Sequence, residues 1–126
     1  MRSAILFMLL ILIALASGCV EPQVADEQRV ETEIPSPAAQ YCSQLGYKYE
    51  IRSKPAGQYG VCVFNGLECD AWEFFTGECG QEFSYCELSG GEITVSTEGC
   101  HFTSKCAVCI YPDKSCNEWD NFNGKC

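Results

Sequence analysis

The chain has 126 residues and a formal net charge of −9, from 8 basic and 17 acidic side chains. This charge argues against nucleic acid and anionic lipid surfaces as partners, because both attract basic proteins. The 11 cysteines are far above average usage. Units of about 45 residues rarely bury enough apolar surface to fold unaided, so we expect disulfides or a metal to contribute to stability.

The N-terminus combines one basic residue, Arg2, with an unbroken apolar run that ends in Ala16-Ser17-Gly18-Cys19. A basic start, an apolar core and small residues before a cleavage point are typical of a secretory signal. Small residues directly before a cysteine resemble a lipobox. That resemblance implies a signal peptide over residues 1–18 and a diacylglyceryl anchor on the Cys19 thiol. The alternative is an uncleaved membrane anchor, because residues 4–20 reach the minimum length of a spanning helix.

The segment that follows is acidic and poor in apolar residues. Residues 20–36 carry five acids, one base and two prolines, with no aromatic residue. Such a segment cannot bury enough surface to offset the entropy lost on ordering. We therefore expect residues 19–36 to form a lipid-anchored, flexible tether of about 20–25 Å on the extracytoplasmic face of the cell membrane. A short amphipathic helix over residues 24–34 is the alternative.

Residues 59–79 align with residues 106–126 without a gap, at an offset of 47. The matched pairs are Val61 with Val108, Cys62 with Cys109, Cys69 with Cys116, Trp72 with Trp119, Phe75 with Phe122, Gly77 with Gly124 and Cys79 with Cys126. This repeat predicts two tandem four-cysteine modules, over residues 37–80 and 81–126. The expected fold class is small, disulfide-rich α+β. Each module would hold a short helix, an antiparallel three-stranded sheet or hairpin, and a short C-terminal helix.

The first module begins with helix signals. Ser36 and Pro37 predict a helix start and Gly46 a helix end. Alternation over Tyr47–Arg52 then predicts a strand with Tyr47, Tyr49 and Ile51 on its half-buried face.

A loop is expected over Ser53–Gln58, which contains proline and glycine. Asn65-Gly66 predicts a tight hairpin, because both positions accept positive φ angles. Asp70 would cap a short helix that ends at Gly77, with Glu73 completing a capping box.

Within that short helix, Trp72 and Phe75 share one face. Of the two adjacent phenylalanines only Phe75 recurs in the second copy, so we expect Phe75 to be buried and Phe74 to be more exposed.

The second module repeats this order with changes. Tyr85-Cys86 matches Tyr41-Cys42, and Glu92–Thr97 predicts a strand in which Ile93 and Val95 alternate with polar residues. A loop that contains Cys100 and Cys106 has no counterpart in the first copy. Asn117 would cap the last helix, with Asp120 at its third position.

Several motifs together resemble a small four-cysteine domain family, domain of unknown function number three hundred and thirty-three. They are Pro37-Ala38-Ala39-Gln40-Tyr41-Cys42, Ile51-Arg52, Gln58-Tyr59-Gly60-Val61-Cys62, Asp70-Ala71-Trp72 and Phe75-Thr76-Gly77-Glu78-Cys79. Bacterial members are often lipoproteins labelled as hemolysins. The resemblance supplies no active site, and where the family has Asp-Glu-Trp this chain has Asp70-Ala71-Trp72 and then Asn117-Glu118-Trp119.

The resemblance implies the disulfide pairing Cys42–Cys62 and Cys69–Cys79, because members that lack one pair lack the last two cysteines together. Aligning the second copy gives Cys86–Cys109 and Cys116–Cys126, which leaves Cys100–Cys106. The competing pair is Cys62–Cys69, which would face each other across the hairpin.

Four features are candidates for chemistry. Cys106-Ala107-Val108-Cys109 has the spacing of a thiol–disulfide exchange site, but it falls on a predicted strand, whereas an activated cysteine needs a helix N-terminus. The first module lacks the paired cysteine knuckles of zinc sites, and residues 120–124 lack the acidic pattern of an EF-hand loop. His101 has no nucleophile beside it in the sequence, so we expect a surface-loop histidine.

The expected function is that of a non-catalytic binding or structural module at the cell surface, without cofactor or metal, whose partner is an unknown protein or surface ligand. Two copies could also give avidity toward a repeated ligand. One alternative is an envelope thiol–disulfide oxidoreductase that uses Cys106 and Cys109. The other is a small protease inhibitor, with Lys54 and Lys105 on the loops Ser53–Gln58 and Glu98–Lys105 as contacts.

Overall fold

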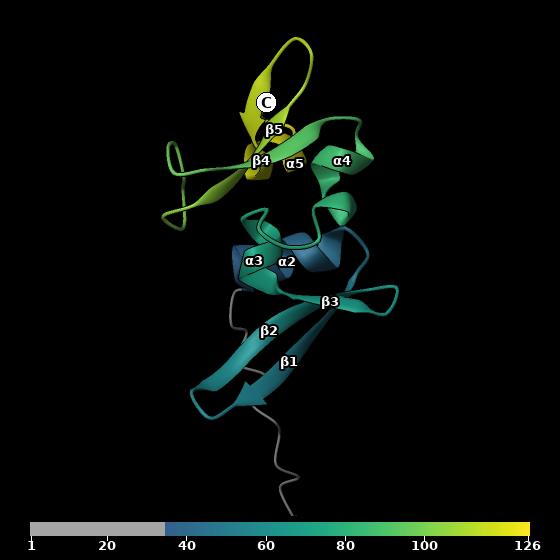
Figure 1. The fold of residues 1–126 in the computed structure, drawn as a ribbon, viewed down its shortest axis with the longest axis vertical. Helices are drawn as coiled ribbons and strands as arrows, with labels where there is room; N and C mark the ends of the chain where they lie inside the picture. Colours follow the sequence, from purple (N-terminus) through teal and green to yellow (C-terminus); the bar gives the residue numbers. More distant parts are fainter. Residues whose placement is uncertain (1–34) are drawn as a thin grey trace, which may run out of the picture. The chain divides into compact units, whose positions relative to one another are not determined.

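The computed structural model describes residues 35–126, which fold into two three-stranded antiparallel sheets and several short helices (Figure 1). The predictions for the signal peptide, for Cys19 and for the tether up to residue 34 lie outside the described residues. No helix among residues 35–126 has both the length and the apolar character needed to cross a membrane.

Apart from η1, the elements follow the same order in both halves of the described chain. We keep the names first and second module for residues 37–80 and 81–126 as a description. The first contains α2 (Pro37–Gln44), β1 (Lys48–Lys54), β2 (Gly57–Phe64), β3 (Leu67–Asp70) and α3 (Ala71–Phe75). The second module, residues 81–126, contains η1 (Gln81–Phe83), α4 (Tyr85–Leu88), β4 (Glu92–Ser96), β5 (Cys106–Ile110), β6 (Ser115–Asn117) and α5 (Glu118–Phe122). Each sheet has the strands in chain order, so the expected small α+β class with antiparallel three-stranded sheets is confirmed.

Helix α2 begins and ends where the sequence predicts. The Ser36 hydroxyl accepts a hydrogen bond from the Ala39 amide at 3.2 Å, and Pro37 occupies the first turn. At the other end the Leu45 amide bonds to backbone carbonyls of the last turn, and Gly46 follows with a φ angle of +87°. A positive φ angle after the last turn stops a helix at low steric cost only for glycine.

The β2–β3 hairpin is confirmed, whereas the expected loop over Ser53–Gln58 is wrong. Asn65 and Gly66 have φ angles of +38° and +91°, as a two-residue turn of this kind requires. Lys54 pairs with Gly57, so β1 and β2 continue to a second two-residue turn. Proline and glycine there mark a tight turn between paired strands, where the sequence pattern indicated an open loop.

The far part of the β1–β2 hairpin extends away from α2 and α3 (Figure 1). Ile51, predicted on the half-buried face of β1, pairs with Gly60 and is 53% exposed. The prediction for Ile51 is therefore wrong, because its neighbours Glu50 and Arg52 on the other face are less exposed than it is. Tyr49 does pack against the sheet, because its ring occupies the space that a side chain at Gly60 would fill.

The core of the first module is aromatic. Its largest buried side chains are Tyr41, Phe64 and Phe74. The ring of Phe74 lies 4.7 Å from that of Phe64 and 5.2 Å from that of Tyr41, between ring centroids. The prediction that Phe74 is more exposed than Phe75 is therefore wrong, because α3 packs on two sides and buries both.

The second module has a much smaller core of its own, formed by Cys86, Ile93, Ala107 and Cys109. Ile93 is buried as predicted, but Val95 on the same strand is 37% exposed. The rings of Trp119 and Phe122 pack against the aromatic core of the first module. The second module therefore places its largest apolar side chains on the first.

Candidate binding site at the junction of the modules

A buried carboxylate joins the two modules. Glu118, the first residue of α5, is only 2% exposed. The Tyr41 hydroxyl and the Cys86 amide donate to one of its oxygens, at 2.5 and 2.8 Å, and the Asn121 side-chain amide donates to the other at 3.1 Å. Tyr41 belongs to the first module, so this network is a polar contact across the junction.

The start of α5 aims the Glu118 side chain inward. Asn117 caps the helix by accepting a hydrogen bond from the Trp119 amide at 3.0 Å, as predicted. Burial raises the pKa of Glu118 above its ordinary value, although the hydrogen bonds from Tyr41, Asn121 and the Cys86 amide act in the opposite direction. Burial, and then the nearby Glu118 carboxylate, raise the pKa of the Tyr41 hydroxyl far above its ordinary value.

Sequence reasoning missed Glu118, because an acid in the first turn of a helix normally complements the helix dipole. The repeat alignment contained one signal. Glu118 aligns with Ala71, which is also buried, so an acid occupies a position that is apolar in the other copy. The carboxylates that the sequence did select are at helix ends: Asp70 caps α3 through two backbone amides, and Asp120 pairs with His101.

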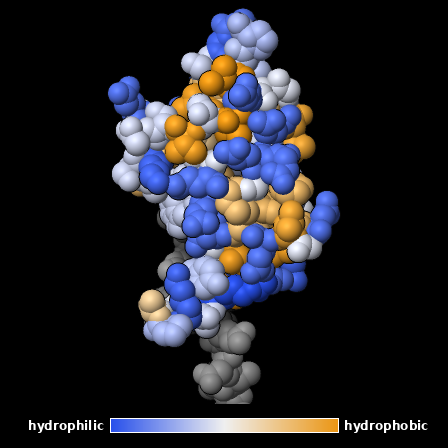
Figure 2. Space-filling view, in the orientation of Figure 1, coloured by the Kyte–Doolittle hydropathy of each residue, from blue (hydrophilic) through white to orange (hydrophobic). Residues whose placement is uncertain are grey.

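Large hydrophobic side chains are exposed in several places on the described chain. Figure 2 shows hydrophobic patches among hydrophilic residues on one face of the molecule. The exposed large hydrophobic side chains are Ile51, Leu67, Trp72, Leu88, Val95, Phe102 and Ile110. Trp72 and Phe102 are the aromatic members of this set, and we call this pair the aromatic surface. Their exposed fractions are 38% and 50%.

The aromatic surface is supported from beneath by rings of both modules. The Phe75 ring lies 5.6 Å from that of Trp72 and 6.0 Å from that of Phe102. Trp119 of α5 lies 5.5 Å from Phe75 and 5.9 Å from Phe102. Edge-to-face contacts of this kind fix ring orientation as well as burying area. The exposed rings are therefore held in defined positions.

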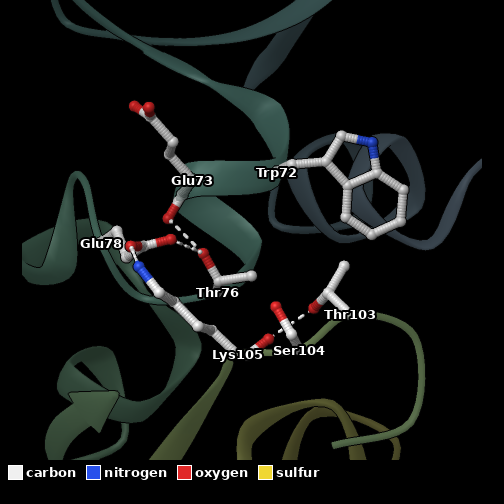
Figure 3. Close-up of a pocket in the computed structure, with 7 residues that line it drawn as sticks. All are labelled: Trp72, Glu73, Thr76, Glu78, Thr103, Ser104 and Lys105. Atoms are coloured by element: carbon white, nitrogen blue, oxygen red, sulfur yellow. Dashed lines mark hydrogen bonds and ion pairs between the residues drawn. The ribbon is translucent and has the colours of Figure 1, made fainter. Parts of the chain in front are cut away.

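A pocket of about 300 Å³ lies beside Trp72 (Figure 3). Its first wall comes from α3 and the turn after it, and its second wall from the loop before β5. The lining residues are Trp72, Glu73, Thr76, Glu78, Thr103, Ser104 and Lys105. The pocket therefore depends on both modules being in place.

An ion pair closes the polar side of this pocket. The Lys105 ammonium contacts one Glu78 carboxylate oxygen at 2.6 Å, and the Thr76 hydroxyl donates to the other at 2.9 Å. The Lys105 contact lowers the pKa of Glu78, and Glu78 in turn raises the pKa of Lys105. Both side chains therefore stay charged near neutral pH, and their charges cancel.

Ten cysteines of the described chain lie in five pairs at disulfide distance, with Cα separations of 5.4–5.9 Å. The pairs are Cys42–Cys62, Cys69–Cys79, Cys86–Cys109, Cys100–Cys106 and Cys116–Cys126. The competing partners Cys62 and Cys69 face each other in the β2–β3 register, but each is paired elsewhere. Cys106 begins β5, so the expected loop ends one residue before it.

One group of potential metal ligands is present among the described residues. The Sγ atoms of Cys86 and Cys109 and a carboxylate oxygen of Glu118 lie within 4.8 Å of one another. The two cysteines are bonded to each other, so neither offers the thiolate that binds a metal. The polar helix end at residues 120–124 pairs with His101 instead, through Asp120 at 3.0 Å. His101 is half exposed, as a surface-loop histidine should be.

The comparisons with known proteins find similarity over part of the chain. Residues 33–78 match the family model described as "Domain of unknown function (DUF333)". A curated relative, an "Uncharacterized protein" of Archaeoglobus fulgidus, is 40% identical over 75 residues. That match covers 58% of this chain and 35% of the relative, so the chain spans about a third of the relative's length. No solved structure matches.

Proposed function

We propose that this protein is a non-catalytic binding module, anchored outside the cell membrane through a lipid on Cys19. The observation that carries the binding role is the aromatic surface of Trp72 and Phe102 beside the 300 Å³ pocket. Exposed aromatic rings held rigidly by their neighbours are typical of binding hot spots. A protein without a partner has little reason to fix two such rings at its surface.

The extracytoplasmic location rests on two independent features. The motif Ala16-Ser17-Gly18-Cys19 follows the apolar run of a secretory signal. Five cysteine pairs at disulfide distance suit an oxidising compartment, because cytosolic proteins rarely keep disulfides. The tether would then carry the described residues outward from the membrane.

The modules are proposed to be tandem copies. Both have the strand order of a simple antiparallel meander, and Cys62 faces Cys69 in one sheet as Cys109 faces Cys116 in the other. The pocket, however, has one wall from each module. This arrangement favours a single shared site over two equivalent sites.

The two alternative functions have less support. Cys106 and Cys109 belong to different cysteine pairs, and Cys109 is fully buried, whereas an exchange site needs an accessible pair. Lys54 lies over the Tyr59 ring at a tight hairpin, and Lys105 is held by Glu78. A protease inhibitor would instead present its contact lysine free on an open loop.

Two experiments test the proposal. For the anchor, the intact mass of the membrane fraction should show cleavage before Cys19 plus a lipid, and Cys19→Ser should release the protein from the membrane. An unmodified chain that still begins at Met1 would contradict the anchor.

For binding, the full chain in detergent should capture a specific surface component. Trp72→Ala should lose that partner, whereas Leu88→Ala, which removes a side chain 62% exposed outside the pocket lining, should keep it. Catalytic turnover of a substrate that is still observed after the protein has been purified to homogeneity would contradict the non-catalytic role.

A further inference from the structure

We propose that the junction pocket binds one neutral sugar unit of a surface glycan, with the sugar ring stacked on Trp72 and its hydroxyls on the Glu78–Lys105 pair. This inference rests on the proposed binding function and names its ligand class. Three properties of the pocket lead to it: one aromatic wall, one polar wall without net charge, and a small volume.

The aromatic wall suits the flat face of a pyranose. Figure 3 shows the Trp72 indole along one side of the pocket, and this side chain is 38% exposed. Phe75 meets this indole at an interplanar angle of 90° and a centroid distance of 5.6 Å, which supports its orientation. The C–H groups on one face of a pyranose carry partial positive charge, and they pack against the electron-rich face of an aromatic ring.

The polar wall suits the hydroxyl edge of the same sugar. Glu78 is already oriented by Thr76 and Lys105, so its carboxylate is a fixed acceptor. Lys105 has three N–H donors, of which Glu78 uses one, and the Ser104 hydroxyl can donate and accept. Adjacent sugar hydroxyls could therefore donate to Glu78 and accept from Lys105 at once. Hydrogen bonds to charged groups are the stronger kind, and they give such a site its specificity.

The charges of the pocket argue against the other ligand classes. A cation would meet the Lys105 ammonium and an anion would meet the Glu78 carboxylate, whereas the Glu73 carboxylate points away from the other lining side chains in Figure 3. An apolar side chain of a protein partner would remove water from the Glu78–Lys105 pair without replacing its hydrogen bonds, which is costly. A volume of about 300 Å³ is at the lower end for small-molecule sites and suits a single sugar unit.

The test uses the full chain in a detergent without a sugar headgroup. The probes are neutral tetrasaccharides of glucose, galactose, mannose and N-acetylglucosamine, followed by tryptophan fluorescence and saturation-transfer NMR. We expect saturable binding of at least one probe. Trp72→Ala should weaken it by about thirtyfold or more, because truncating a central aromatic side chain is among the largest effects at a binding site. Trp72→Phe should retain part of the affinity, and Leu88→Ala all of it.

Each outcome separates the sugar proposal from the proposed function. Saccharide binding that depends on Trp72 supports both. If no saccharide binds but a charged peptide or a protein does, with the same dependence on Trp72, the sugar proposal is overturned and the binding function stands. Saccharide binding that Trp72→Ala leaves unchanged overturns this site. If nothing binds in either experiment, the proposed function itself is overturned. The fluorescence of Trp119, which remains in Trp72→Ala, verifies that this variant is folded.

Discussion

The two modules share an order of elements, apart from η1, but reach stability by different means. The first packs the rings of Tyr41, Phe64, Phe74 and Phe75 around two cysteine pairs. The second has four buried core residues of its own, two of which are the Cys86–Cys109 pair, and it adds Cys100–Cys106. Where a folding unit is too small to bury a sufficient apolar core, disulfides supply part of the stability that the core would otherwise provide.

The difference also explains why the junction is both apolar and polar. Trp119 and Phe122 of the second module pack against the first module, where they join its aromatic cluster. Glu118 sits beside them with its hydrogen bonds satisfied, and no buried polar side-chain atom of the described residues lacks a partner. The second module is thus a unit completed by docking, and the first is a unit completed by its own core.

The largest expected effect is loss of the central pair of the second module. Chain entropy predicts about 3 kcal/mol of stability for Cys86–Cys109 and for Cys42–Cys62, whose sequence separations are 23 and 20. If the second module lacks a sufficient core, removing Cys86–Cys109 with alanines should expose β4 and β5 to rapid amide exchange. The matched double variant at Cys42 and Cys62 should keep slow exchange in its aromatic core.

Hydrogen exchange with mass spectrometry measures this contrast, and non-reducing peptide mapping of the parent protein verifies the pairs. Equal exchange in the two variants would argue against the comparison. A Cys62–Cys69 peptide would refute the pairing itself.

The next effect concerns the polar contact across the junction. Glu118→Ala leaves the Tyr41 hydroxyl, the Cys86 amide and the Asn121 amide without their acceptor. Removing an acceptor so that a buried donor is left unpaired costs about 1–3 kcal/mol, and more where a charged group is involved. Urea unfolding at neutral pH should therefore show a loss of about 2–4 kcal/mol in the free energy of unfolding. Glu82→Ala, an exposed acid on η1, is the control and should leave stability unchanged. Equal losses of stability in Glu118→Ala and Glu82→Ala would mean that the change in net charge, and not the buried hydrogen-bond network, determines the effect.

Two aligned glycines give a smaller and sharper test. Gly77 and Gly124 both have positive φ angles, so alanine costs about 1–2 kcal/mol at either position. A side chain at Gly77 would also meet the Ala107 Cβ atom at 3.1 Å across the junction, whereas position 124 is open. We therefore expect Gly77→Ala to be less stable than Gly124→Ala by about 1 kcal/mol or more. Thermal unfolding of both variants measures the difference, which should vanish if the modules do not pack there.

The smallest expected effect is a pH dependence. Burial raises the pKa of Glu118 in the folded protein above its value in the unfolded chain. The unfolded state therefore releases this proton first as pH rises, and the contribution to stability is fully present below the unfolded pKa and lost through the folded pKa. Glu118→Gln should make stability less dependent on pH in that window. Parallel profiles of the two proteins in urea unfolding would contradict this.

The sequence predicts elements that local rules determine. Ser36, Asp70 and Asn117 cap helices because short polar side chains satisfy free amides, and Asn65-Gly66 turns because its φ angles allow it. The burial of Phe74, Ile51 and Glu118 does not follow from local rules, because it depends on which elements pack over them. The pocket could not be predicted at all, because its walls come from segments that only docking of the two modules brings together.

The contact between Tyr41 and Glu118 joins residues 77 positions apart, and this affects how the protein is made. A chain emerging from its N-terminus can complete the core of its first module before α5 exists. Until then Tyr41 has no carboxylate partner, and the ring of Phe75 lacks the cover of Trp119. A chain that ends before α5 would leave the Tyr41 hydroxyl without Glu118 and the Phe75 ring without Trp119, and apolar surface exposed in this way favours aggregation.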